Sequence, residues 1–402
     1  MTTSNVSRRG FLKLAGAAGA AAGAVALVGC SDDSSSESTG GSEASGSAFV
    51  LGHIGPLTGA TAIYGNATQN GAQIAVDEIN AEGGDIQFKL ESQDDENDAE
   101  KSVNAYHTLV DSGMQVLVGT TTTTPCVAVA AESNADRIFQ LTPSASSTEV
   151  IADKDNVYQM CFTDPNQGTA SAQYIDEQGL GTKIAIIYNN ADAYSTGIHD
   201  KFVEEAESRG LEIVSDEAFS DDSATDFSVQ VAAAKDAEAD LVFLPIYYTP
   251  ASQILIEADK QEYKPSFFGV DGMDGILGVE NFDTSLAEGV MLLTPFNADS
   301  EDEATQSFVT AYKDAYDETP NQFAADSYDC VYAIKQALEA AECTPDMSAE
   351  EICDALIATF PSGDFSFTGI TTGGEPATWA DTGEVSKQPM GMRIENGAYV
   401  GM

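Results

Sequence analysis

The chain has 402 residues, with 17 Lys and Arg against 65 Asp and Glu, so its formal net charge is −48. A hydrophobic content of 43%, with 18 Phe and 14 Tyr, excludes a disordered chain, because disordered chains lack the apolar side chains that offset ordering entropy. So negative a chain cannot neutralise phosphates, which excludes nucleic acids and anionic membrane surfaces as electrostatic partners. Its acids would repel one another in dilute buffer, whereas the screening length in molar salt is only about 3 Å, so we expect a halophilic protein.

Residues 1–29 have the composition of an export signal. Arg8 and Arg9 precede Phe11 and Leu12, an Ala/Gly-rich apolar run follows, and the stretch contains no acidic residue. The adjacent arginines resemble a twin-arginine signal. A transmembrane anchor is the less favoured alternative, because the apolar run is shorter than about 18 residues and is diluted by Gly and Ala.

The export signal ends at Cys30, and a low-complexity segment follows. Leu27-Val28-Gly29-Cys30 resembles the lipobox of lipoproteins, in which the cysteine is lipidated and becomes the new N-terminus. Residues 30–46 are rich in Ser, Gly and acids, which is typical of a flexible linker. The sequence therefore predicts a body tethered by a lipid to the outer face of the cytoplasmic membrane. An unmodified Cys30 is the alternative.

From residue 48 onward, short apolar runs alternate with segments of helical spacing. The runs typical of buried strands are 49–51, 86–90, 116–118, 138–141, 184–187, 241–244 and 267–268. The predicted helices are 69–80, 99–110, 171–177, 198–208, 228–235, 252–263, 303–316, 321–342 and 350–359, and the last forty residues return to short strands. Strand and helix in repeated alternation predict parallel α/β sheets, and the pattern runs twice, before and after about residue 165. Two such sheets leave a cleft where ligands bind beyond the carboxyl ends of the strands.

The sequence offers little for catalysis or metal binding. The histidines, His53, His107 and His199, have no metal-ligand spacing with one another or with Cys. A nucleophile elbow, a phosphate-binding loop and a G-x-G-x-x-G motif after the first strand are all missing from the sequence. We therefore expect no enzyme, no metal and no cofactor.

Two cysteines are candidates for a disulfide. Cys343 and Cys353 flank a turn between two predicted helices, and an exported protein meets oxidising conditions. The sequence predicts either a Cys343–Cys353 bond or two buried thiols.

An ordered series of motifs carries a family resemblance. The motifs are Gly55-Pro56-Leu57-Thr58-Gly59, Asn80-Ala81-Glu82-Gly83-Gly84, Gln93-Asp94-Asp95, Thr142-Pro143-Ser144-Ala145 and Tyr194-Ser195-Thr196-Gly197. Together they resemble the leucine/isoleucine/valine-binding proteins of ABC importers, over about residues 48 to 400.

The resemblance implies a two-lobed periplasmic-binding-protein fold, each lobe a parallel sheet flanked by helices, with a hinge of three crossovers near residues 164, 295 and 372. The N-terminal lobe would comprise residues 47–163 and 296–371. The C-terminal lobe would comprise 164–295 and 372–402.

The resemblance also implies a site for a zwitterion in the cleft between the lobes. Thr123, beside a helix start, would offer a hydroxyl, a backbone N–H and the positive end of a helix dipole to a carboxylate. Ser146 would act likewise, and the Ser144 carbonyl would accept from the ligand ammonium. The run Thr120–Thr124 leaves the contacting threonine open by one residue.

The other lobe would supply the partner of the ammonium and an aromatic wall. Asp271, directly after a predicted strand, stands where leucine-binding members of the family carry a longer Glu. Charge-assisted pairing in a closed cleft is strong. Tyr64, Tyr194 and Tyr247 would supply rings and hydroxyls around an aliphatic side chain.

The function implied is that of an extracytoplasmic solute-binding protein that captures an amino acid, branched-chain or otherwise apolar, and passes it to ABC permease and ATPase subunits. We expect a monomer that performs no chemistry. Two alternatives remain open. The same fold could bind urea, a short amide or another small carboxylate, or it could act as a ligand-sensing receptor domain.

Overall fold

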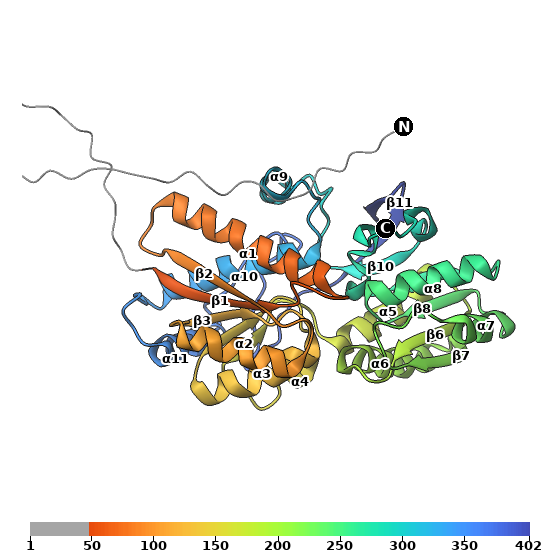
Figure 1. Cartoon of the computed structure of the whole chain (residues 1–402), viewed down its shortest axis with the longest axis horizontal. Coiled ribbons are helices and arrows are strands. Elements are labelled where there is room, and N and C mark those ends of the chain that lie inside the picture. Colours follow the sequence, from red (N-terminus) through yellow and green to blue (C-terminus); the bar gives the residue numbers. More distant parts are fainter. Residues whose placement is uncertain (1–47) are drawn as a thin grey trace, which may run out of the picture. The chain divides into compact units, whose positions relative to one another are not determined.

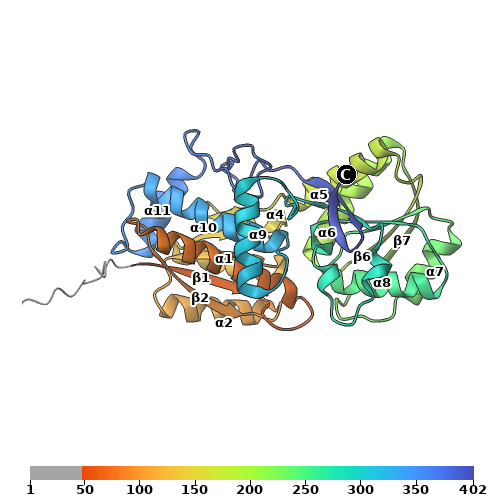
Figure 2. The ribbon, with the colours of Figure 1, turned by 90° about the horizontal axis from the view of Figure 1, so that it is seen from above.

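The computed structural model describes residues 48–402, which form two sheets covered by helices. Figures 1 and 2 show the two groups of elements side by side. The α/β class and the alternating order of strands and helices predicted from the sequence are confirmed. The twin-arginine signal, Cys30 and the linker 30–46 lie outside the described residues. No helix within 48–402 combines the length and apolarity that a membrane crossing requires.

The first lobe is built on a five-stranded parallel sheet of order β2-β1-β3-β4-β5. Its strands are β1 Phe49–Gly55, β2 Phe88–Asp94, β3 Val116–Gly119, β4 Phe139–Thr142 and β5 Val157–Gln159. Its helices are α1 Ala62–Glu82, α2 Ala99–Asp111, α3 Thr123–Asp136, α4 Thr148–Ile151, α9 Glu303–Tyr316, α10 Gln322–Ala340 and α11 Ala349–Thr359. Helices α1 and α10 pack together although about 250 residues separate them, as the hydrogen bond from Tyr328 to Glu78 shows.

The second lobe is built on a seven-stranded sheet of order β12-β11-β10-β9-β8-β6-β7. Its strands are β6 Lys183–Asn189, β7 Glu212–Phe219, β8 Leu241–Leu244, β9 Ser266–Gly269, β10 Met291–Thr294, β11 Met390–Glu395 and β12 Ala398–Gly401. Its helices are α5 Asp164–Gln178, α6 Ala193–Arg209, α7 Ser228–Asp236 and α8 Tyr248–Lys260, with short 3-10 turns η1 Asp271–Met273, η2 Ile276–Gly278 and η3 Thr284–Ala287. Strand β11 is antiparallel to β10 and β12, while the other pairs are parallel.

The buried strands of both sheets explain why their sequences are continuous apolar runs. Every residue of β3, β4, β8 and β10 is buried, because helices cover both faces of a parallel sheet. Gly83 and Gly210 end α1 and α6 in the left-handed conformation, with φ of 70° and 77°. At these positions glycine avoids the steric penalty that a Cβ would bring.

The structure corrects the lobe boundary expected near residue 372. Trp379 lies in the hydrophobic core of the first lobe, and its indole N–H donates to Gln159 O of β5 at 2.8 Å. Gln159 N in turn donates to Gly383 O at 3.0 Å. The chain therefore stays with the first lobe well beyond residue 372 and enters the second sheet only at β11, because burial of the indole fixes this segment against β5.

The predicted Cys343–Cys353 disulfide is wrong. All five cysteines of residues 48–402 are buried and free. Cys343 and Cys353 both lie in the apolar core of the first lobe, where their thiols pack against hydrophobic side chains. This matches the alternative of two buried thiols, since cysteine behaves as a small hydrophobic residue in such surroundings.

Candidate functional site

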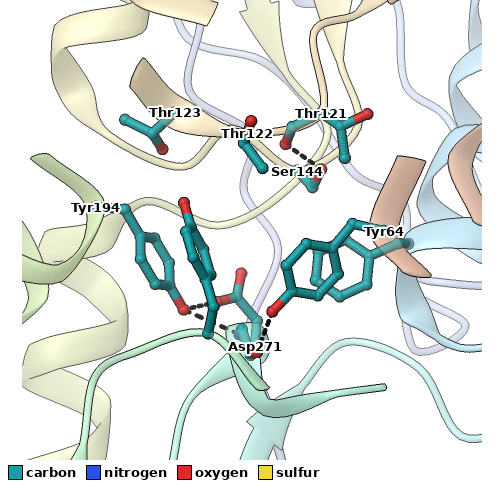
Figure 3. A pocket seen from close by; sticks show the side chains of 10 residues that line it. Tyr64, Thr121, Thr122, Thr123, Ser144, Tyr194 and Asp271 are labelled. Atoms are coloured by element: carbon teal, nitrogen blue, oxygen red, sulfur yellow. Dashed lines mark hydrogen bonds between the residues drawn. The ribbon is translucent and has the colours of Figure 1, made fainter. Parts of the chain in front are cut away.

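A small cavity of about 10 Å³ lies where loops of both lobes meet (Figure 3). Its lining residues are Tyr64, Thr121, Thr122, Thr123, Ser144, Tyr194, Tyr247, Asp271, Gly272 and Phe323. Figure 3 shows the threonines and Ser144 on one side and Asp271 and Tyr194 on the other. The structure thus brings together every site residue predicted from the sequence except Ser146.

The N-terminus of α3 forms one end of the cavity. The first N–H groups of a helix have no acceptor within the helix, and the N-cap residue Thr122 makes no side-chain capping bond. Its hydroxyl instead donates to Asn97 Oδ1 at 2.7 Å. Thr123 opens the helix and is buried at the cavity wall. Uncapped amides and the helix dipole favour a negatively charged group at this end.

Two hydroxyls beside this helix end face the cavity as acceptors. Ser144 Oγ donates to Thr121 O at 2.6 Å, so its single proton is engaged. Thr121 Oγ1 lies 2.9 Å from Thr68 Oγ1 and 3.5 Å from Ile54 O, so its proton has an acceptor within the protein. Because both protons are engaged within the protein, Thr121 and Ser144 present only oxygen lone pairs to a ligand.

Asp271 forms the opposite end of the cavity. Its carboxylate accepts from the Tyr194 hydroxyl at 2.6 Å, and that hydroxyl accepts from Gly272 N at 2.9 Å. The Asp271 backbone is fixed by Gln167 Oε1, which accepts from Asp271 N at 3.3 Å, and by Gln322 Nε2, which donates to Asp271 O at 2.7 Å. Within residues 48–402, no Lys, Arg or His pairs with this carboxylate.

Burial of Asp271 changes its acidity. Only 4% of the residue is exposed, and burial raises the pKa of its carboxyl to about 7, against the hydrogen bond from Tyr194, which lowers it. A buried carboxylate without a cation is costly, and a cationic ligand group would remove that cost. The electrostatics of this end therefore favour a positively charged group.

Aromatic rings form the wall between the two ends. Tyr64 lies 4.3 Å from Phe323 and 5.5 Å from Tyr247 between ring centroids, and Tyr247 stacks on Tyr194 at 4.9 Å. The Tyr64 hydroxyl donates to Gly272 O and accepts from Tyr248 N at 3.2 Å, so it is fully engaged. The rings therefore offer mainly apolar faces to the cavity.

Three hydrogen bonds beside the aromatic wall join the two lobes. Tyr64 belongs to α1 of the first lobe, whereas Gly272 and Tyr248 belong to the second. Tyr248 Oη accepts from Ile63 N at 3.1 Å. This arrangement encloses the cavity between the lobes.

Ser146 does not line the cavity. Its backbone oxygen accepts from Asp164 N at 2.9 Å, and its hydroxyl is buried without a partner. Conversely, sequence reasoning did not single out Gly272 or Phe323, and it left Thr121 and Thr122 within the ambiguous run Thr120–Thr124. Phe323 lies in a predicted helix, where nothing in its spacing distinguishes it from an ordinary core residue.

A wider hollow of about 750 Å³, open to solvent, lies between α1, α9, the segment 274–278 and the β11–β12 turn. None of the predicted site residues lines it. In the described part of the chain, no group of three or more His, Cys, Asp or Glu side chains is arranged to hold a metal ion.

Comparison with known proteins places the chain in a family. A family model described as periplasmic binding protein matches residues 48–398. The Leu/Ile/Val-binding protein BraC3 of Rhizobium johnstonii is 28% identical over 317 residues, which cover 77% of this chain and 83% of the relative. The Leu/Ile/Val-binding protein homolog 3 of Brucella melitensis is 26% identical over 363 residues, covering 88% and 93%.

Solved structures share the fold. The branched-chain amino acid transporter substrate binding protein LivJ of Streptococcus pneumoniae, in complex with isoleucine, has a TM-score of 0.78 at 27% identity and covers 88% of this chain and 100% of its own. A solute binding protein of R. palustris, in complex with benzoate, has a TM-score of 0.77 at 18% identity, covering 88% and 95%. At the latter identity the likeness concerns the fold alone.

Proposed function

Because this chain belongs to the periplasmic binding protein family, we propose that it is the extracytoplasmic solute-binding component of an ABC importer, with an apolar, branched-chain amino acid as its ligand. One observation carries the choice of ligand. A buried carboxylate without a cationic partner, Asp271, faces an uncapped helix N-terminus across an aromatic cavity. These two ends have the opposite polarities that the two charges of a zwitterion require.

Each part of an amino acid would have its own contacts. The carboxylate would accept from the first amides of α3 and the Thr123 hydroxyl. The ammonium would pair with Asp271, and the lone pairs of Ser144 and Thr121 are further acceptors. The side chain would lie against Tyr64, Tyr247 and Phe323, where burial of apolar surface contributes about 25 cal/mol per Å².

Contacts from both lobes are needed for this site, so the lobes would close around the ligand and open to release it to the permease. The relatives named above are binding proteins, which supports a role without catalysis.

A carboxylate without an amine is the second candidate ligand. The benzoate-bound neighbour shares the fold, and the aromatic wall suits a ring. Such a ligand would leave Asp271 without a partner, so it requires the carboxyl to be protonated. Urea or a short amide would bind without using the charge at either end. A receptor domain that reports the ligand to a membrane sensor would use the same site.

The test is a thermal-shift and calorimetric screen of the purified protein in molar KCl. The probes are leucine, isoleucine, valine, 4-methylpentanoate, benzoate and urea. A ligand at about 100 times its dissociation constant stabilises the folded protein by about 2.7 kcal/mol. Stabilisation by the amino acids and not by 4-methylpentanoate at pH 8 supports the proposal. Stabilisation only by benzoate, or only by urea, would replace the amino acid as the ligand.

We also propose that Cys30 carries a lipid and that residues 30–46 tether the body to the membrane. A Cys30→Ser variant expressed in a host that lipidates exported proteins should be released from the membrane fraction, whereas the parent chain should remain there. Equal release of both proteins would exclude the anchor.

A further inference from the structure

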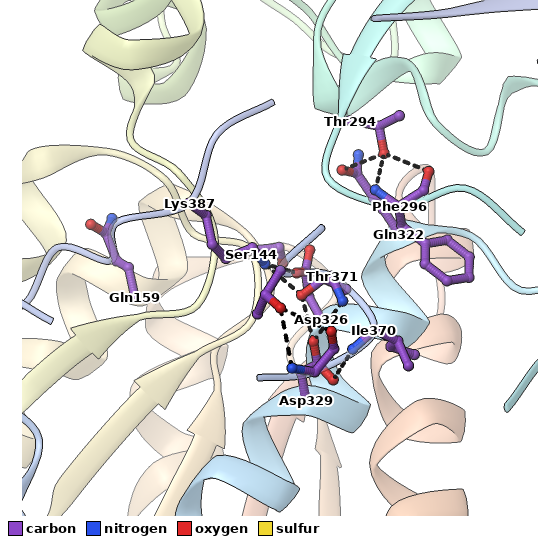
Figure 4. A network of polar contacts seen from close by, with 12 residues as sticks. Ser144, Gln159, Thr294, Phe296, Gln322, Asp326, Asp329, Ile370, Thr371 and Lys387 are labelled. Carbon is purple, nitrogen blue, oxygen red and sulfur yellow. Dashed lines mark hydrogen bonds and ion pairs between the residues drawn. The ribbon is translucent and has the colours of Figure 1, made fainter. Parts of the chain in front are cut away.

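One face of α10 carries a row of polar side chains that reach the site and the chain segments between the lobes (Figure 4). Gln322, Asp326 and Asp329 are spaced by four and three residues, so they lie on the same face of the helix. Gln322 donates to Asp271 O, and its Oε1 accepts from Thr294 Oγ1 at 3.1 Å, at the end of β10. The next residue, Phe323, lines the cavity.

Asp326, one helical turn further along, is paired with Lys387. Lys387 Nζ lies 2.6 Å from Asp326 Oδ1, with only 1% and 3% of the two side chains exposed. Among residues 48–402, Lys387 is the only lysine or arginine with a buried side chain. It lies in the segment that leads from the first lobe into β11.

Neighbouring groups complete the cluster. Lys387 Nζ also donates to Thr371 Oγ1 at 2.6 Å. Thr371 N and its hydroxyl donate to Asp329 Oδ2 at 2.8 and 2.6 Å. The cluster therefore contains two carboxylates and one ammonium, all shielded from solvent, where salt screens charges much less than at the surface.

The position of this cluster gives it a bearing on the ligand site. A helical turn spans about 5.4 Å, so Asp326 is about one turn from the residue that holds the Asp271 carbonyl. At a separation of this order, a single uncompensated charge in a buried site would act on Asp271. The ion pair cancels most of that effect.

We propose that Lys387 and Asp326 are positioning residues for ligand binding, in which the Lys387 ammonium offsets the charge of Asp326 that would otherwise act on Asp271, the partner of the ligand ammonium. The proposal rests on the amino-acid site described above. It assigns to the segment before β11 an electrostatic role in addition to its structural one.

The direction of the effect follows from the groups that face Asp271. These are Tyr64, Tyr194, Cys161, Asp164 and Asp326. The Asp326 charge contributes to the raised pKa of Asp271, after the larger effect of burial. The groups that face Asp326 are Lys387, Asp329, Cys161 and Cys330. Removal of the Asp326 charge alone takes one negative charge from the cluster and leaves Asp329 as the remaining carboxylate near Lys387. This loss of negative charge favours the ionised form of Asp271.

The experiment compares the parent chain, Asp326→Asn, and the double variant Asp326→Asn/Lys387→Met in molar KCl. Leucine affinity is measured by calorimetry from pH 5 to 9, and the carboxyl carbon of Asp271 is titrated by NMR without ligand. Asp326→Asn should lower the midpoint of both profiles by about one pH unit, which gives roughly tenfold tighter leucine binding at pH 6. The double variant should return both midpoints to those of the parent.

A purely structural clamp would give another pattern. Both variants would then weaken leucine binding by the same factor at every pH, with unchanged midpoints, and the proposal would be overturned. If the NMR midpoint of Asp271 shifts as expected between the parent and Asp326→Asn, but the parent binds no amino acid, the proposed ligand is overturned and the coupling is supported. Unchanged NMR midpoints in a chain that binds leucine would overturn the coupling alone.

Discussion

Replacement of Asp271 by Asn keeps the size of the side chain and its ability to accept from Tyr194, but removes the charge that would pair with a ligand ammonium. A hydrogen bond to a charged group contributes about 1.5 to 3 kcal/mol, against about 1 kcal/mol for a neutral one. At pH 8, where Asp271 is ionised, Asp271→Asn should therefore weaken leucine binding by roughly tenfold or more.

The pH dependence makes this prediction more specific. Burial raises the pKa of Asp271 to about 7, so below that pH the parent chain must lose a proton to bind an ammonium. Its apparent affinity should fall by about tenfold per pH unit below pH 7. The amide of the Asp271→Asn variant does not titrate, so the affinity of the variant should be flat, and the two affinities should converge between pH 5 and 6.

Isothermal titration calorimetry with leucine from pH 5 to 9 in molar KCl measures both curves. Asp364→Asn, which removes one exposed charge far along the chain, is the control and should follow the parent. Equal affinities of parent and Asp271→Asn at pH 8 would remove Asp271 from ligand recognition. If the affinities of the parent and Asp271→Asn change with pH in parallel, the raised pKa of Asp271 is not the cause of the pH dependence of leucine binding.

Asp271→Asn should stabilise the ligand-free fold at pH 8. The pKa of Asp271 is raised in the folded state, so the parent loses stability as the pH rises from 3.8 to about 7, by at most about 4 kcal/mol. Denaturant titrations at pH 5 and 8 measure this difference. Thr123→Val should weaken leucine binding about fivefold to thirtyfold while leaving the melting temperature nearly unchanged, because it removes only a hydroxyl donor at the cavity. Tyr64→Phe should lower the free energy of unfolding of the ligand-bound protein by about 1 to 3 kcal/mol, since Gly272 O and Tyr248 N lose their partner. Equal melting temperatures of the parent and this variant would contradict the prediction. Unfolding without reductant should expose five reactive thiols from residues 48–402, whereas a count of three would support a Cys343–Cys353 disulfide. Circular dichroism should show the fold strengthening with added KCl, whereas a fully stable fold without salt would exclude the halophilic interpretation.

The order of strands and helices could be read from the sequence because each apolar run is local. Strands β3, β4 and β8 are fully buried and stand out as continuous hydrophobic stretches. Strand β7 was missed because it lies at the sheet edge and is only partly buried, so its sequence mixes Glu and Asp with apolar residues. Strand β5 was missed because it has only three residues.

Most of the site was also predictable, since loops that follow parallel strands converge at one edge of a sheet. Asp271 follows β9 and Thr123 follows β3, so their positions along the chain already placed them near a cleft. What the sequence leaves open is which neighbours meet there. Phe323 reaches the cavity from a helix that packs on α1 of the first lobe, and Ser146 does not line the cavity although it lies two residues from Ser144.

Long-range packing decided the rest. Burial of Trp379 against β5 holds the last segment of the first lobe past the expected crossover, and the Lys387–Asp326 pair forms between residues 61 positions apart. Composition and periodicity determine local structure because they report burial one residue at a time. The partners of a buried indole, thiol or ammonium depend on contacts between distant segments, and these exist only once the chain has folded.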